Sequence, residues 1–182
     1  MRIFLAIAFD EGVKGYIDGI TNSLESKVRG SYVKRQNLHL TLKFLGELTN
    51  TKLQAVEKAV YNTACKCSPF SLITSYCGAF RGMDGNTLWL GLNKEEKLNK
   101  LFELLEENLS AEDFPKDSRT FSPHITLARR AKEKIPEDFK LRTPINIAVD
   151  GITIFESLRI GNDLVYKPLL FADFPSKLAH QN

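Results

Sequence analysis

The chain has little histidine, cysteine or tryptophan. Its 182 residues include three histidines, three cysteines and one tryptophan. The cysteines, Cys65, Cys67 and Cys77, are odd in number and follow no framework of spacings, which favours reduced thiols in a cytosolic protein. Cys65 and Cys67 could form half of a metal site, but no second pair of ligands follows them. We therefore predict no metal and no other cofactor, and a cytoplasmic location.

Long apolar runs and strong net charge are also missing. No run approaches the roughly 20 apolar residues that span a bilayer, so we expect no membrane association. The start of the chain resembles a short signal peptide, but its apolar run ends at Phe9 and leads directly into Asp10 and Glu11, which favours a first core strand. The net charge of +3 gives a mild preference for anionic partners without the basic surface of a general nucleic-acid coat.

The remaining composition is that of an ordinary globular protein. Hydrophobic residues make up 43% of the chain and charged residues 26%, a composition that argues against an intrinsically disordered chain. A chain of this length can bury one sizeable core. We predict one bilobal domain over residues 1–175 and a loose C-terminal tail over residues 176–182.

Hydrophobic periodicity predicts a mixture of helices and antiparallel strands. Helices are expected over residues 10–27, from Thr49 or Asn50 to about 64, and over 94–109. Strands are expected at 2–9, 31–34, 37–46, 70–80, 87–92, 122–130, within 143–156, and at 164–171. Glycine-containing turns at 82–86 and 161–163 indicate hairpins. The order predicts an α+β fold with two sheet lobes facing each other and helices outside.

The two interior histidines occupy the same four-residue pattern, one in each half of the chain. The runs are His39-Leu-Thr41-Leu and His124-Ile-Thr126-Leu, whereas the third histidine, His180, lies in the tail. Side chains alternate along a strand, so each His and its Thr share one face while the apolar residues share the other. The same alternation predicts that Phe44 is a core residue; stacking on a nucleobase is the alternative for it.

Two histidines and two threonines in one cleft suit acid–base chemistry at a phosphate. Near pH 7 one imidazole can accept a proton while the other donates one. The hydroxyl groups can donate hydrogen bonds to phosphate oxygens as negative charge develops, and an arginine can add a bidentate contact. Either histidine alone would be an ordinary strand residue; the repetition is what favours catalysis.

These motifs and their surroundings resemble the RNA 2′,3′-cyclic phosphodiesterase family, also called 2′-5′ RNA ligase, of the 2H phosphoesterase superfamily. The resemblance rests on residues 1–7 (MRIFLAI), 37–47 (NLHLTLKFLGE), 88–92 (LWLGL), 121–129 (FSPHITLAR) and 154–157 (IFES). It runs in matching order from residue 1 to about 172. It implies two pseudo-symmetric lobes of antiparallel sheet around a central cleft, with helices packed on the outside.

The resemblance also implies an activity and its residues. The expected reaction is metal-free hydrolysis of an RNA-terminal 2′,3′-cyclic phosphate to a 2′-phosphomonoester. By analogy, His39 is the general acid, His124 the general base, and Thr41, Thr126 and Arg129 bind the phosphate. The expected partners are RNA ends or nucleotides bearing the cyclic phosphate, with no obligate protein partner and a monomeric chain.

Three alternatives stay open at this point. Strict alternation places Arg130 rather than Arg129 on the histidine face, unless the strand ends or bulges there. The same groups could run 2′-5′ ligation, in which a 5′-hydroxyl replaces water. A non-catalytic RNA-end binder is the alternative from another class of protein, although binding alone needs cations and stacking surfaces rather than two imidazoles.

Overall fold

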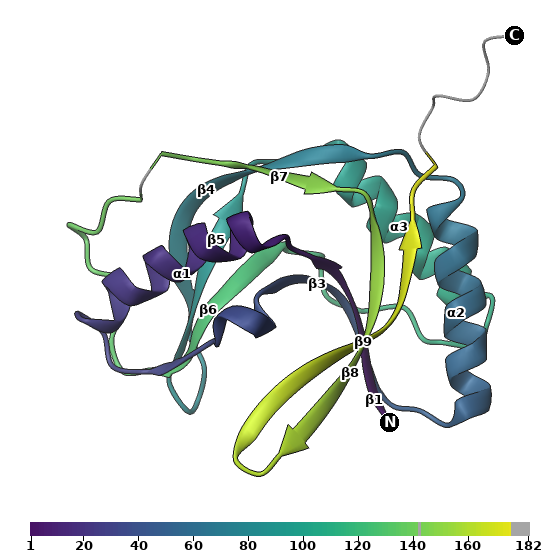
Figure 1. Cartoon of the computed structure of the whole chain (residues 1–182), viewed down its shortest axis with the longest axis horizontal. Helices are drawn as coiled ribbons and strands as arrows, with labels where there is room; N and C mark the ends of the chain where they lie inside the picture. Colours follow the sequence, from purple (N-terminus) through teal and green to yellow (C-terminus); the bar gives the residue numbers. More distant parts are fainter. Residues whose placement is uncertain (142, 176–182) are drawn as a thin grey trace, which may run out of the picture.

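In the described part of the chain, the fold consists of two antiparallel sheets with three helices outside them (Figure 1). It is described from a computed structural model over residues 1–141 and 143–175, so the predicted tail with His180 lies outside the described residues. The helices are α1 (Glu11–Glu25), α2 (Asn50–Ala64) and α3 (Glu96–Ser110), and a 3₁₀ turn, η1, spans Arg35–Asn37. The strands are β1 (Arg2–Ala8), β2 (Ser31–Tyr32), β3 (His39–Glu47), β4 (Phe70–Phe80), β5 (Asn86–Leu92), β6 (His124–Ala131), β7 (Asn146–Val149), β8 (Gly151–Ile160) and β9 (Asp163–Asp173).

The strand order divides the two histidine motifs between the sheets. The four-stranded sheet has the order β3-β1-β8-β9, and the five-stranded sheet has the order β2-β6-β5-β4-β7. The motif of His39 therefore lies on an edge strand of the first sheet, and the motif of His124 lies within the second. The predicted α+β fold with two antiparallel lobes is confirmed.

The helices begin where side-chain caps allow it and bury one apolar stripe each. Asp10 accepts a hydrogen bond from the backbone N–H of Val13 (2.8 Å), and Thr49 accepts one from that of Lys52 (3.3 Å). Both caps agree with the predicted helix starts. The buried stripe of α3 consists of Leu98, Leu101, Leu105 and Leu109.

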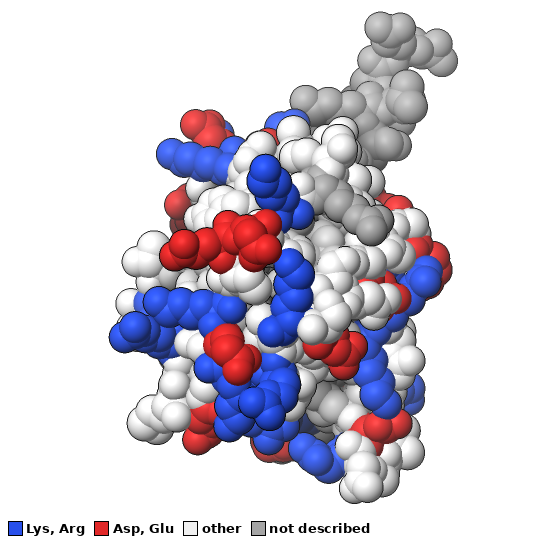
Figure 2. Space-filling view, turned by 90° about the vertical axis from the view of Figure 1, so that its left-hand side faces the viewer, with Lys and Arg blue, Asp and Glu red and all other residues white. Residues whose placement is uncertain are grey.

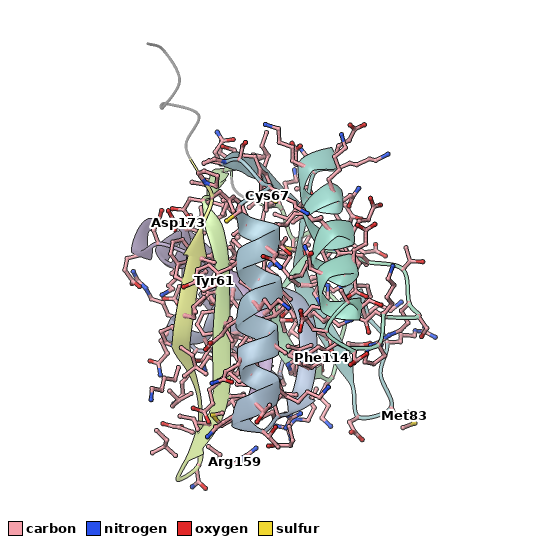
Figure 3. The ribbon with its side chains drawn as sticks, turned by 90° about the vertical axis from the view of Figure 1, so that its right-hand side faces the viewer. Tyr61, Cys67, Met83, Phe114, Arg159 and Asp173 are labelled. Atoms are coloured by element: carbon pink, nitrogen blue, oxygen red, sulfur yellow. The ribbon has the colours of Figure 1, made fainter. Side chains whose placement is uncertain are left out.

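The core lies between the sheets and their helices. Residues 3–7 of β1 are at most 1% exposed, because β1 is paired on both edges, with β3 and β8. Helix α1 contacts β6, and α2 packs against β8 and β9. Figure 3 shows α2 and α3 side by side on one flank of the molecule. In the described part of the chain, no helix is long and apolar enough to cross a membrane.

The segment before the first motif differs from the prediction. A strand was expected from residue 37, but η1 occupies residues 35–37 and β3 begins at His39. The side chain of Asn37 explains the difference. Its Nδ2 donates to the carbonyl of Leu164 (2.7 Å), and its Oδ1 accepts from the backbone N–H of Tyr166 (3.3 Å). Asn37 thus binds β9, so the strand can start only after it.

Candidate active site: a cleft between the two sheets

Both histidines are held by the same local contact. The Nδ1 atom of His39 donates to the carbonyl of Asn37 (2.7 Å), and the Nδ1 atom of His124 donates to the carbonyl of Ser122 (2.8 Å). A carbonyl can only accept, so each Nδ1 carries the proton and each neutral ring has its lone pair on Nε2. In His39 that Nε2 lies 2.9 Å from the hydroxyl of Thr41. The repeated pattern therefore gives both rings the same tautomer.

The two rings differ in their surroundings. The His39 ring packs against Phe4 (4.9 Å between ring centroids) and edge-on against Tyr166 (5.2 Å), and the His124 ring packs edge-on against Phe80 (5.0 Å). Both side chains are half-buried, but the contact of His39 to Asn37 is partly buried whereas that of His124 to Ser122 is exposed. Burial lowers the pKa of His39 from 6.5 to about 4; the carbonyl of Asn37 opposes this shift, and the charges of Arg129 and His124 add to it. The His39 ring is therefore neutral at pH 7 while the cleft holds no anion.

Each motif strand contains a bulge at the same place. In the pairing of β1 with β3, Leu5 faces Lys43 and Ala6 faces Thr41, which leaves Leu42 without a partner residue. In the pairing of β5 with β6, Leu88 faces Ala128 and Trp89 faces Thr126, which leaves Leu127 without one. A bulge reverses the alternation beyond it. The fifth residue after each histidine consequently returns to the histidine face.

In the first motif that residue is Phe44. The prediction that Phe44 is a core residue is wrong: its side chain is 62% exposed and lines the cleft beside Thr41, while Lys43 is buried in its place. The error comes from the bulge, because strict alternation from His39 assigns Phe44 to the opposite face.

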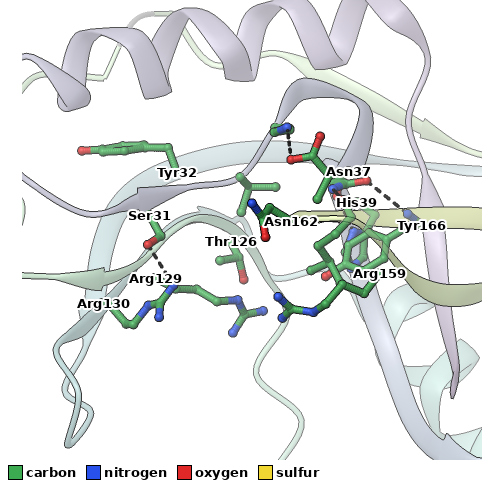
Figure 4. Close-up of a pocket in the computed structure, with 14 residues that line it drawn as sticks. Ser31, Tyr32, Asn37, His39, Thr126, Arg129, Arg130, Arg159, Asn162 and Tyr166 are labelled. Carbon is green, nitrogen blue, oxygen red and sulfur yellow. Dashed lines mark hydrogen bonds and ion pairs between the residues drawn. The ribbon is translucent and has the colours of Figure 1, made fainter.

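In the second motif the corresponding residue is Arg129. Its side chain lines the cleft together with Thr41, His124 and Thr126 on one side and with His39 on the other. Arg130 has a φ of 53° and donates from its guanidinium to the hydroxyl of Ser31 (3.2 Å), as Figure 4 shows. The structure thus brings Arg129 between both motifs, whereas the end of the Arg130 side chain is bound at the cleft margin.

The cleft is a set of adjoining hollows that share Arg129. One of about 440 Å³ includes His39, Thr126 and Arg129, and one of about 460 Å³ includes Thr41, His124, Thr126 and Arg129. A third, of about 370 Å³, lies between Arg129, Phe44 and the β8–β9 hairpin. The two His-Thr pairs predicted from the sequence therefore line adjoining hollows of one cleft.

Arg159 also lines the cleft and was not identified from the sequence. It stands near the end of the β8–β9 hairpin, and its guanidinium group points toward that of Arg129 in Figure 4. No carboxylate of the described residues forms an ion pair with either guanidinium group. Nothing in the sequence near Arg159 indicates that the hairpin leans over the cleft. Two guanidinium groups that line the same hollows without an ion-pair partner make this part of the cleft suited to an anion.

The charge balance of the hollow that includes His39 agrees with an anionic ligand. Its lining includes four cations, Lys34, Arg129, Arg130 and Arg159, against the carboxylate of Asp163. Asp163 is itself paired with Lys34 at 2.7 Å. The side view in Figure 2 shows Lys and Arg side chains gathered in the lower half of that face. Within residues 1–141 and 143–175, no group of three or more His, Cys, Asp or Glu side chains could hold a metal ion.

Comparison with known proteins identifies the family. Residues 10–160 match the sequence profile of the 2′-5′ RNA ligase superfamily. The chain belongs to this superfamily. The resemblance seen in the two motifs is therefore confirmed, and the two histidine motifs of this 2′-5′ RNA ligase superfamily member lie on the strands that line its cleft.

Individual relatives cover nearly the whole chain. The RNA 2′,3′-cyclic phosphodiesterase of Thermotoga maritima is 33% identical, and the match covers 98% of each chain. The protein of that name from Escherichia coli is 30% identical, with 92% of this chain and 93% of the relative covered. The crystal structure of E. coli LigT complexed with 3′-AMP has a TM-score of 0.81 and 26% identity, covering 95% of this chain and 97% of LigT.

Proposed function

We propose that the protein hydrolyses RNA-terminal 2′,3′-cyclic phosphates to 2′-phosphomonoesters. The observation that carries this proposal is the pair of equivalent histidines, each with a threonine beside it and a fixed tautomer, in one positively charged cleft. The relatives from T. maritima and E. coli, named RNA 2′,3′-cyclic phosphodiesterase, support the same substrate class. A protein that only binds RNA ends has no need of two imidazoles.

The reaction uses the two rings on opposite sides of the phosphorus. Water loses a proton to Nε2 of His124 as its oxygen attacks phosphorus, and the bond from phosphorus to the 3′-oxygen breaks. Nε2 of His39 gives a proton to that 3′-oxygen, so the phosphate stays on the 2′-oxygen. His124 suits the base because its contact to Ser122 is exposed, so water can reach that ring, while His39 lies among Phe4, Phe155 and Tyr166.

The negative charge of the bound phosphate favours the protonated form of His39, which the general acid requires. The pKa of His39 is about 4 in the free protein, so the ring must gain its proton when the anion binds. Thr41, Thr126 and Arg129 line the space next to both rings and would hold the non-bridging oxygens. Arg159 would add a second cation from the opposite side of the cleft.

The exposed ring of Phe44 provides a surface for the base of the reacting nucleotide. It lines the same hollow as Thr41 and His124, and its far side is open to solvent. An aromatic ring beside a phosphate site favours a nucleotide over a small phosphodiester, because every base can stack on it.

The cellular setting remains part of the proposal. Cys65, Cys67 and Cys77 are free thiols, which is the usual state of cysteine in a reducing compartment. We place the enzyme in the cytoplasm, where it acts on cyclic-ended RNA or nucleotides as a monomer without an obligate protein partner.

Phosphorus NMR of a 2′,3′-cyclic nucleotide with the pure protein in EDTA tests the function. We expect the cyclic phosphate signal to be replaced by that of a nucleoside 2′-phosphate. A 3′-phosphate product would contradict the proposed breaking of the bond to the 3′-oxygen, and activity that returns only with a divalent ion would contradict the metal-free reaction.

A further inference from the structure

A row of aromatic rings runs across the cleft-side face of the five-stranded sheet, starting at His124. Phe80 meets the His124 ring edge-on, with 5.0 Å between ring centroids. Trp89 lies 5.1 Å from Phe80, and Tyr76 lies 5.4 Å from Trp89. Trp89 pairs directly with Thr126 on the neighbouring strand, so the row shares the face that carries the second motif.

Two glycines let the central ring of this row lie close to the sheet. A Cβ atom on Gly78 would come within 2.3 Å of the Trp89 ring, and one on Gly91 within 3.1 Å. Gly78 is the cross-strand partner of Trp89, and Gly91 is that of His124. Side chains at these positions would push the Trp89 indole away from the sheet and interrupt the row, so glycine at both positions allows the indole to lie against the sheet.

The row is open to solvent and continuous with the cleft. Tyr76 is 65% exposed and Phe80 39% exposed, although both are large aromatic residues. A groove of about 310 Å³ runs along them and reaches Phe121 and Ser122, which also line the hollow that holds His124. The proposed reaction at the phosphate does not use this groove.

The groove carries one lysine and one glutamate among its lining residues, so its charges balance and do not repel an RNA strand. Lys94 and Glu95 line it. The carboxylate of Glu95 accepts a hydrogen bond from the backbone N–H of Lys97 (3.0 Å) and so caps α3. Exposed rings on a sheet face next to a phosphate site are a surface on which single-stranded RNA bases stack.

We propose that the row formed by Phe80, Trp89 and Tyr76 binds bases of an RNA strand whose 5′-hydroxyl faces His124. The inference rests on the proposed function, because it takes His124 as the base that receives the proton of the nucleophile. The 5′-oxygen then attacks phosphorus in place of water, the bond to the 3′-oxygen breaks, and the 3′-oxygen takes its proton from His39. The product is a 2′-5′ phosphodiester, and the groove decides how often the strand outcompetes water.

The single tryptophan of the chain reports binding directly. A short oligoadenylate with hydroxyl groups at both ends is titrated while Trp89 fluorescence is recorded, with the cleft occupied by saturating adenosine 2′-phosphate. We expect quenching, and we expect Tyr76→Ala to raise the Kd about tenfold, since each stacked base contributes on that scale. Tyr76→Phe keeps the ring and should bind as the wild type does.

A matched control separates this effect from a general loss of an exposed tyrosine. Tyr61 is 48% exposed on α2, on the flank shown in Figure 3, and lines neither the groove nor the cleft hollows. Tyr61→Ala should leave the quenching unchanged. Absence of quenching in the wild type, or equal Kd values for Tyr76→Ala and Tyr61→Ala, would overturn the proposal.

A product ratio tests the consequence for the reaction. Cyclic-ended RNA is mixed with the 5′-hydroxyl strand, and ligated and hydrolysed products are measured together. Tyr76→Ala should lower the ratio of ligated to hydrolysed RNA about tenfold, which a simple loss of active enzyme would not do. An unchanged ratio in Tyr76→Ala would overturn the proposal. If the wild-type protein opens no cyclic phosphate at all, the proposed function fails instead, and the fluorescence titration still decides whether the row binds RNA.

Discussion

Lys43 on β3 and Glu106 on α3 form a buried ion pair, with 4% and 8% of their side chains exposed. Lys43 stands in the bulge after Thr41, and its ammonium also donates to the carbonyl of Pro115 (2.9 Å). Glu106 accepts from the backbone N–H of Asp117 (2.8 Å). The pair therefore connects β3 with the loop that leads to His124, and so links the two motifs.

Removing one partner of this ion pair should destabilise the protein strongly. We expect Lys43→Met to lower the free energy of unfolding in urea by about 3–5 kcal/mol, because it leaves the carboxylate of Glu106 buried without its counter-charge. The double variant Lys43→Met, Glu106→Leu should recover part of that loss. Lys58→Met is the control, since Lys58 pairs with Glu112 at the surface and should cost at most about 1 kcal/mol. Equal losses for Lys43→Met and Lys58→Met would contradict this account of the buried pair.

The two neighbouring arginines should behave differently in kinetics. Arg129→Ala is expected to lower kcat/KM for a 2′,3′-cyclic nucleotide by about 100- to 1000-fold, because it removes a cation that stabilises charge on the phosphate. Arg130→Ala should stay within a few-fold of wild type, since its guanidinium is bound to Ser31. Initial rates for both variants measure this, and a larger loss for Arg130→Ala would reverse the assignment.

Phe44 should act on substrate binding rather than on the chemical step. We expect Phe44→Ala to raise KM for a cyclic nucleotide about tenfold, with little change in kcat, because the variant loses a stacking surface next to the base. Phe44→Tyr keeps a ring and should resemble the wild type. Steady-state kinetics decide the point: an unchanged KM in Phe44→Ala would show that the base does not use this ring.

Burial of His39 predicts a pH dependence of stability. The pKa of His39 is about 4 in the folded protein and about 6.5 when unfolded, so between these values the unfolded state binds more protons. The free energy of unfolding is therefore unaffected by this group above pH 6.5 and falls by an amount on the order of 3 kcal/mol as the pH drops to 4. His39→Asn lacks this group, so its unfolding free energy should vary less steeply over that range than that of the wild type. Parallel slopes in urea unfolding would contradict the lowered pKa.

Local patterns revealed most of the fold and the core of the candidate site. The stripes of α1, α2 and α3 and the alternation from His39 to Thr41 depend on neighbours in sequence, so they can be read without the structure. Local patterns assign Asn37 to a strand, which is wrong because its side chain bonds to β9, far along the chain.

The remaining site residues depend on long-range pairing. The bulges at Leu42 and Leu127 arise from the register of β3 with β1 and of β6 with β5. They explain why alternation misplaced Phe44 and why Arg129 rather than Arg130 reaches between the motifs. Arg159 joins the cleft only through the position of the β8–β9 hairpin, which no local pattern gives.

The central claim is that His39 and His124 act as one acid–base unit, and kcat/KM of their alanine variants tests it most directly. We expect His39→Ala and His124→Ala each to lower kcat/KM for a 2′,3′-cyclic nucleotide by about 1000-fold or more. The double variant should be only slightly less active than the less active of the two single variants. Turnover at the wild-type rate in either single variant, or losses that multiply in the double variant, would contradict it.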